Sequence, residues 1–112
     1  MSFEKLSRRE KEIVLQCMKA TVAYIDDWEK QTRLGLEPYE LKSVIDNWPF
    51  IDDANEEGPG FLAINNCLNE VCHGFYITDE DWRTWFDAPM MEIKGTYLTW
   101  LSLRGLSSGG IR

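Results

Sequence analysis

The stretch SRREKEIVLQCMKATVAYIDDW, residues 7–28, decides the fold class. Its apolar residues recur at steps of three and four, which is the period of one face of an α-helix. Ser7 and Glu10 form a capping-box pair, and this pair predicts that the helix begins directly after Ser7. We expect the buried face to consist of Ile13, Val14, Cys17, Thr21, Tyr24 and Trp28.

Further helical segments follow in the middle of the chain. Glu37 and Pro38 open one that stops before Pro49, because proline suits the first turn of a helix and disrupts its interior. Pro59 opens another, and Gly74 is expected to end it in the left-handed conformation. These punctuation residues predict helices over about 37–48 and 58–74.

The last third of the chain contains two more helical segments. Thr78 and Asp81 form a second capping-box pair, and a final segment is expected over residues 89–104. No part of the sequence alternates apolar and polar residues for long enough to predict a strand. We therefore predict an all-α fold in a single domain, 1–112: a small helical bundle of five to six helices with a flexible Gly/Ser-rich tail at 105–112.

A short motif recurs at a spacing of 26 residues, as YIDD at 24–27, FIDD at 50–53 and YITD at 76–79. At twice that spacing further residues match, among them Trp48 with Trp100. Self-similarity at a fixed period is typical of related helical units. It predicts two pseudo-symmetric halves, at about 7–50 and 58–104, and chance matching in a helix-rich sequence is the alternative.

Composition narrows the class of partner. The 112 residues include 12 Lys and Arg against 19 Asp and Glu, which gives a net charge of -7 and a pI near 4.6. Such a balance disfavours nucleic acid and anionic membranes as partners and permits a basic protein. The first ten residues are rich in charged side chains, so we expect no secretory signal. No apolar run is long enough for a membrane span, and three cysteines cannot all pair within the chain. We expect a reduced, cytoplasmic protein.

The acidic motifs are the main candidates for a binding site. Asp26 and Thr78 suit the N-cap position of a helix, so a capping role explains much of the pattern. If the repeated units stack, their carboxylates could also line one edge and attract a basic partner. Trp82 and Trp85, three residues apart beside this acid, could add aromatic contacts. The predicted partner-binding residues are Asp26, Asp27, Asp52, Asp53, Asp79, Asp81, Trp82 and Trp85.

The Asn-rich stretch INNCLNEVCHGF, residues 64–75, offers an alternative site. Asparagine is a mediocre helix former, so several in one helix suggest either hydrogen bonds to other elements or a pocket. The pocket alternative would use Asn65, Asn69, Glu70 and His73. Catalytic residues are not assigned, because no nucleophile motif is present and neighbouring side chains on a helix diverge, as those of Cys72 and His73 would. No metal site or cofactor is expected.

Two segments suggest DNA binding. The segment LSRREKEIVL, 6–15, resembles the opening of the DNA-binding domains of LuxR-type regulators, and TRLGLEPYELKSVI, 32–45, has the pattern of a helix-turn-helix. The resemblance implies a DNA-binding regulator. Charge argues against it, because residues 26–46 contain six acidic and only three basic side chains.

These observations predict a small, acidic, cytoplasmic protein-binding module. The more specific hypothesis is an inhibitor of a basic protein, of the immunity or antitoxin type. The alternatives are a small enzyme or ligand-binding protein with a pocket beside the Asn-rich helix, and a degenerate helix-turn-helix regulator. We expect binding rather than catalysis, and the sequence does not predict the oligomeric state.

Overall fold

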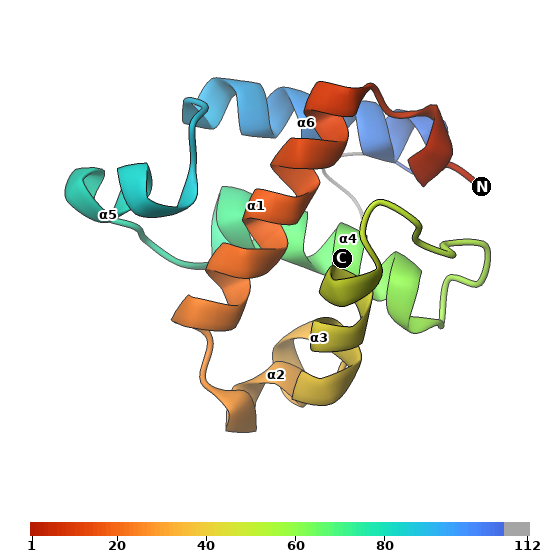
Figure 1. Cartoon of the computed structure of the whole chain (residues 1–112), viewed down its shortest axis with the longest axis horizontal. Coiled ribbons are helices and arrows are strands. Elements are labelled where there is room, and N and C mark those ends of the chain that lie inside the picture. Colours follow the sequence, from red (N-terminus) through yellow and green to blue (C-terminus); the bar gives the residue numbers. More distant parts are fainter. Residues whose placement is uncertain (107–112) are drawn as a thin grey trace.

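The computed structural model describes residues 1–106, and every regular element in that range is helical (Figure 1). The prediction of an all-α bundle is therefore confirmed. The elements in chain order are η1 (Phe3–Lys5), α1 (Arg8–Tyr24), α2 (Asp27–Leu34), α3 (Pro38–Asn47), α4 (Pro59–Asn69), the π-helical turn η2 (Glu70–Gly74), α5 (Asp79–Trp85) and α6 (Met90–Leu103).

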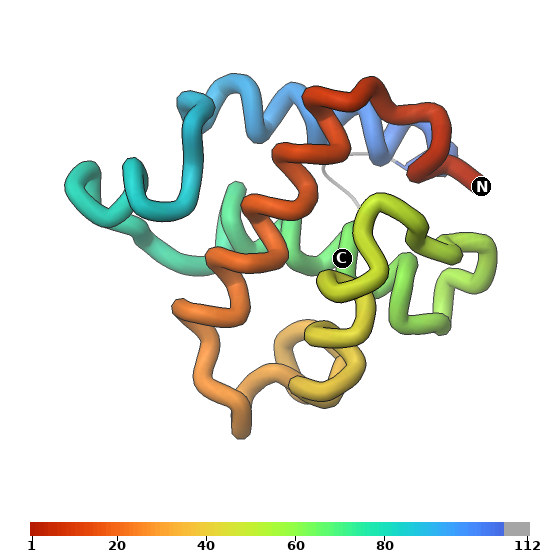
Figure 2. The backbone as a smooth tube through the Cα atoms, viewed as in Figure 1, coloured from red at the N-terminus to blue at the C-terminus, as the bar shows by residue number. Residues whose placement is uncertain are grey.

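Helices α1 and α4 form the centre of the bundle. They cross each other, as Figure 2 shows, and the remaining helices pack around them. Ile13 and Met18 of α1 are fully buried in the same apolar core as Ile64 and Leu68 of α4. Trp100 of α6 is also fully buried, so a single apolar core joins the first helix to the last.

Helix α1 begins as expected and ends earlier. The capping box is present, with the Ser7 hydroxyl accepting the N–H of Glu10 and the Glu10 carboxylate accepting the N–H of Ser7. The helix stops at Tyr24, because the next two residues are extended. Trp28 therefore belongs to the first turn of α2 and is 79% exposed, and its expected place on the buried face of α1 is wrong.

The two halves of the chain show a matching order of elements. α5 begins at Asp79, 52 residues after Asp27 of α2, and α6 begins 52 residues after α3. The packing is reciprocal, since α2 contacts α4 and α5 contacts α1, while α3 and α6 each contact both central helices. An internal duplication would produce this arrangement, and the duplication itself stays a prediction.

One expectation about glycine is wrong, and the flexible tail expected at 105–112 stays a prediction. Gly74 is not left-handed; among the glycines of residues 1–106, those with positive φ are Gly35 and Gly105, both at 72°. Gly105 and Leu106, expected in a flexible tail, form a turn directly after α6, where the N–H of Leu106 bonds to the carbonyl of Leu101 at 2.8 Å. The remainder of that expected tail, 107–112, lies outside the described residues.

Candidate functional site

The six predicted aspartates occupy three separate places. Asp26 and Asp27 lie at the corner between α1 and α2, and Asp79 and Asp81 lie in the first turn of α5. Asp52 and Asp53 lie in the connection from α3 to α4. Figure 1 shows that connection and α5 at opposite ends of the molecule's long axis. The single acidic edge expected from stacked repeats is therefore not formed.

Asp53 is a structural residue. It is fully buried, and its Oδ2 accepts the N–H groups of Ser2 and Phe3 at 3.0 and 3.1 Å and a hydrogen bond from Arg104 Nη1 at 3.3 Å. The guanidinium of Arg104 also lies over the ring of Phe61, 4.8 Å from its centroid. Asp53 thus joins η1, the α3–α4 connection and α6, and its predicted role as an exposed partner contact is wrong.

α5 brings together four of the eight predicted partner-binding residues. The helix is fixed to α1 by Tyr24, whose hydroxyl donates to Asp81 Oδ2 at 2.9 Å and whose ring stacks on Phe75 at 5.3 Å. Burial, and then the bond to the Asp81 carboxylate, raise the pKa of Tyr24. The side chain of Trp85 lowers the same pKa, by less than these two effects raise it. Tyr24 is therefore the residue that positions α5.

An apolar groove of about 320 Å³ runs beside α5. We call it the α5 groove, and its lining residues are Val71, Phe75, Tyr76, Ile77, Asp79, Trp82 and Met90. Trp82 is held in place, because its indole N–H donates to the carbonyl of Ala88 at 2.8 Å and its ring stacks on Phe86 at 4.3 Å. Tyr76 is 79% exposed. The groove thus has a fixed aromatic wall and an exposed aromatic rim.

The charge beside the α5 groove is mostly negative. Asp79 and Glu80 are exposed, and within residues 1–106 neither carboxylate takes part in an ion pair or side-chain hydrogen bond. Basic side chains in this part of the molecule are Arg83 on α5, Lys19, which lines a hollow together with Trp85, and Lys94, which is close enough to Cys72 to act on the pKa of its thiol. This end of the molecule therefore offers carboxylates that no cation of the described chain neutralises.

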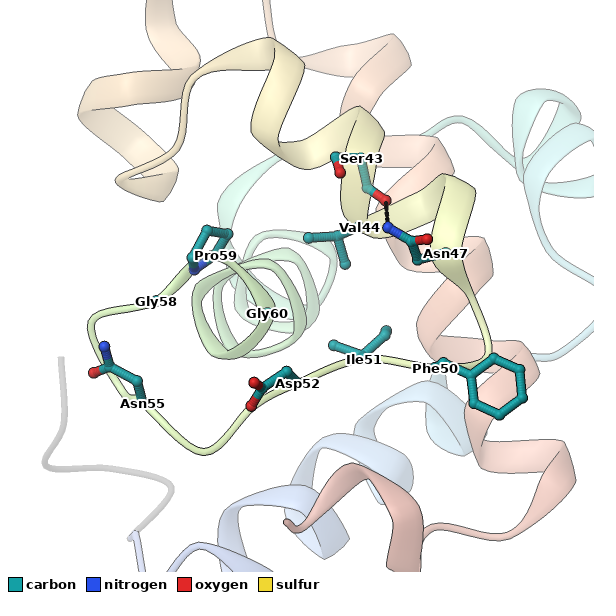
Figure 3. Close-up of a pocket in the computed structure, with 10 residues that line it drawn as sticks. All are labelled: Ser43, Val44, Asn47, Phe50, Ile51, Asp52, Asn55, Gly58, Pro59 and Gly60. Carbon is teal, nitrogen blue, oxygen red and sulfur yellow. Dashed lines mark hydrogen bonds between the residues drawn. The ribbon is translucent and has the colours of Figure 1, made fainter.

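A second concave surface, drawn in close-up in Figure 3, lies beside the α3–α4 connection, which Figure 1 shows at the end of the molecule opposite α5. This groove of about 360 Å³ lies between the C-terminal half of α3, the α3–α4 connection and the start of α4. Phe50 borders it and is 83% exposed, and it also borders a hollow of about 460 Å³ on its other side. Of the acids in this connection, Asp52 accepts the N–H of Ala54 and Glu56 pairs with Arg104 at 3.2 Å, while Glu57 is exposed.

The Asn-rich helix uses its polar groups inside the fold. Asn65 accepts a hydrogen bond from Trp100, and Asn69 accepts one from Tyr97 at 3.2 Å. Glu70 forms an ion pair with Arg33 of α2, and this carboxylate occupies the space where a Cβ at position 74 would lie. His73 is exposed, with its ring centroid 6.3 Å from that of Tyr97. None of these predicted pocket residues lines the grooves above.

The thiols are poorly suited to chemistry. Burial raises the pKa of Cys67 to about 12 and that of Cys72 to about 11, and it also raises the pKa of Cys17. A nucleophilic cysteine needs a lowered pKa, so these three behave as small apolar side chains. Within residues 1–106, no three His, Cys, Asp or Glu side chains come together as a metal ligand set requires.

The helix-turn-helix pattern is present in outline. Three residues connect α2 to α3, and the first of them is the left-handed Gly35. The exposed residues of α3 include Tyr39, Lys42 and Asp46, and the last two neutralise each other at 3.1 Å. A helix with this surface supplies little positive charge for DNA phosphates.

No protein-family model matches this chain, and neither a curated protein nor a solved structure is similar enough to match it. None of the helices within residues 1–106 combines the length and apolar character that crossing a membrane requires. The function therefore has to be inferred from the grooves and charges themselves.

Sequence reasoning missed the exposed aromatic residues. Tyr76, Phe50 and Trp28 are the most exposed aromatic side chains of the described chain, and none was expected at a site. A signal existed for Tyr76, because Phe75 and Tyr76 are adjacent in an extended segment, where neighbouring side chains face opposite ways. Since Phe75 stacks on Tyr24, Tyr76 had to face outward.

Proposed function

We propose that this protein is a binding module for a basic protein partner, and that α5 and the α5 groove form its contact surface. The observation that carries the proposal is the pair of exposed carboxylates of Asp79 and Glu80, which no described cation neutralises, beside an apolar aromatic groove. Tryptophan and tyrosine are enriched among the few residues that dominate the binding energy of protein interfaces, while charges around them select the partner and speed its approach.

The net charge of the chain supports the same proposal. At -7, the protein as a whole attracts a positively charged partner and repels an acidic one. Trp82 and Trp85 lie on the helix that carries the two carboxylates, so apolar and acidic groups are presented together. This combination is typical of interfaces that recognise a basic surface.

An inhibitor of the immunity or antitoxin type, acting in the cytoplasm, is the specific form of this proposal. Such a protein needs a small stable fold and a surface complementary to a basic target, and it needs neither a catalytic site nor a cofactor. The α5 groove and the acidic first turn of α5 provide the surface complementary to a basic target.

The ligand-binding and DNA-binding alternatives have less support. Asn65, Asn69 and Glu70 are occupied by bonds to Trp100, Tyr97 and Arg33, so they have little capacity left for a ligand. The exposed face of α3 has no excess of positive charge, which a DNA-reading helix needs around it.

The proposal is tested by affinity capture from the native host with three forms of the tagged protein. The test form is Asp79→Asn/Glu80→Gln, and the matched control is Asp46→Asn/Glu57→Gln, which removes the same charge elsewhere on the surface. Asp81 is left intact because it holds Tyr24. We expect a basic protein to be retained by the wild type and the control and lost by the test form. Equal retention by all three forms would contradict the proposal.

A further inference from the structure

Helices α2 and α5 both begin with an aspartate, but only the aspartate of α2 is paired with a lysine of its own helix. Each follows an extended N-cap residue and starts with an aspartate, Asp27 in α2 and Asp79 in α5. In α2 the residue three positions later is Lys30, and in α5 it is Trp82. The two helices therefore allow a direct comparison of the same local site with and without a cation.

Lys30 shows what a lysine does at such a site. Its side chain is only 2% exposed, and its ammonium donates to Asp27 Oδ1 at 2.7 Å and to the carbonyl of Ile25 at 2.6 Å. The carbonyl of Val22 lies 3.4 Å away. The stem is buried while the ammonium meets a carboxylate and backbone oxygens, which is how a lysine is accommodated in an apolar setting.

The equivalent cation is missing at α5. The residue in the position of Lys30 is Trp82, which carries no charge. Its indole faces Phe86 and Ala88. Asp79 instead lines the α5 groove, together with Tyr76 and Met90. The groove thus combines an apolar wall, suited to a methylene stem, with a carboxylate that no ammonium of the described chain reaches.

We infer that the α5 groove receives a lysine side chain from the basic partner, with its ammonium beside Asp79 and its stem along Tyr76, Trp82 and Met90. This inference rests on the proposed function and specifies the chemistry of the partner: a lysine flanked by apolar residues, as on one face of an amphipathic helix. Methionine and aromatic side chains suit such a segment, because both bind apolar groups and the aromatic rings also attract cations to their faces.

Two basic side chains set the limits of the site. Arg83 is exposed on α5, and Lys94 lies near Cys72, the neighbour of the groove residue Val71. Both add positive charge to the surroundings of the groove and so oppose a second bound cation. We therefore expect one lysine to be bound at Asp79 and Glu80, and not a run of basic residues along the whole groove.

The test uses a synthetic amphipathic helix of leucine and lysine, about four turns long, as the probe. Matched peptides carry glutamate in place of lysine, or serine in place of leucine. Binding is followed to millimolar concentration by the nuclear magnetic resonance signals of the five indole N–H groups. The test variants are Tyr76→Ser and Asp79→Asn, and the matched controls are Tyr39→Ser and Asp46→Asn, which alter an exposed tyrosine and an exposed aspartate on α3.

We expect the leucine–lysine peptide to shift the Trp82 signal and to bind about tenfold more weakly to Tyr76→Ser, as loss of a large aromatic contact predicts. Asp79→Asn should weaken binding by about three- to tenfold, as loss of a facing charge does. Neither control variant should change the dissociation constant. The two matched peptides should bind weakly, because each lacks one of the required features.

Three results would overturn the inference. If Phe50→Ser weakens binding and Tyr76→Ser does not, the lysine is bound at the opposite end, and only the basic partner of the proposed function survives, without α5 as its contact surface. If the leucine–lysine peptide fails to bind while affinity capture still depends on Asp79 and Glu80, the inference of a lysine in the groove fails. The proposal that the acids of α5 contact a basic partner is then kept. If the glutamate peptide binds as well as the lysine peptide and capture is insensitive to the acids, the inference and the proposed function both fail.

Discussion

The indole N–H of Trp100 donates a hydrogen bond of 3.1 Å to the side-chain oxygen of Asn65, and both residues are buried. The amide of Asn65 donates in turn to Asn66 at 3.2 Å, and Asn66 donates to the carbonyl of Leu34 at 2.8 Å. These three bonds connect α6, α4 and the end of α2. The unusual asparagines of α4 therefore serve as internal connections between helices.

Replacing Asn65 by alanine should destabilise the protein by about 2–3 kcal/mol, because the Trp100 N–H would be left unpaired in the core. The matched control is Asn47→Ala, whose exposed bond to the Ser43 carbonyl should contribute less than about 0.5 kcal/mol. Urea unfolding at neutral pH measures both. Equal effects of the two substitutions would contradict an internal role for Asn65.

Gly60 and Gly95 should respond to alanine with opposite signs. A Cβ at Gly60 would lie 2.0 Å from the backbone oxygen of Asp52, whereas a Cβ at Gly95 meets nothing within 4 Å. Gly60→Ala should cost about 1–3 kcal/mol through overpacking, and Gly95→Ala should stabilise by about 0.5–1 kcal/mol through helix propensity. Thermal unfolding of the two variants checks the pair, and a stabilised Gly60→Ala protein would contradict the close approach of α4 to the α3–α4 connection.

Lys30→Met should destabilise the protein by about 1–3 kcal/mol, because the carbonyl of Ile25 loses its buried donor and Asp27 loses its ammonium. Lys19 is exposed on α1 and provides the control, for which Lys19→Met should change stability by less than about 0.5 kcal/mol. Chemical denaturation distinguishes the two. A silent Lys30→Met substitution would remove the structural basis for comparing α2 with α5.

Asp87 should make stability depend on pH in the acidic range. Its carboxylate accepts hydrogen bonds from Gln16 at 2.8 Å and from Arg9 at 2.9 Å, and these interactions lower its pKa. A lowered pKa in the folded state means that the stabilisation is complete above the unfolded-state value of about 3.9 and is lost as the pH falls through the folded-state value. The stability difference between wild type and Asp87→Asn should therefore shrink below about pH 4. A difference that stays constant from neutral pH to acid would count against this carboxylate as the cause.

The helical elements were predictable because their signals are local. The capping box of Ser7 and the apolar period from Ile13 to Thr21 lie within single helices, and the structure reproduces both. Trp28 shows the limit of such reasoning. A helical wheel assumes that the helix continues, and the extended residues Ile25 and Asp26 break the period before Trp28 is reached.

The candidate site was only partly predictable. Asp79, Asp81, Trp82 and Trp85 are close in sequence, so their grouping on α5 followed from the helix alone. Burial of Asp53 could not be foreseen, because it depends on N–H groups some fifty residues earlier and on Arg104, 51 residues later. The α5 groove likewise needs Val71 and Met90 from two other elements. Contacts of this kind depend on packing that no local pattern encodes.

The most direct measurement of the central claim is the affinity of the captured basic partner for wild-type protein and for Asp79→Asn/Glu80→Gln, at about 0.05 and 0.5 M salt. If α5 presents the contact surface, the wild type should bind about tenfold more tightly at low salt, and the two forms should converge at high salt as the charges are screened. Equal affinities of the two forms at both salt concentrations would contradict the account.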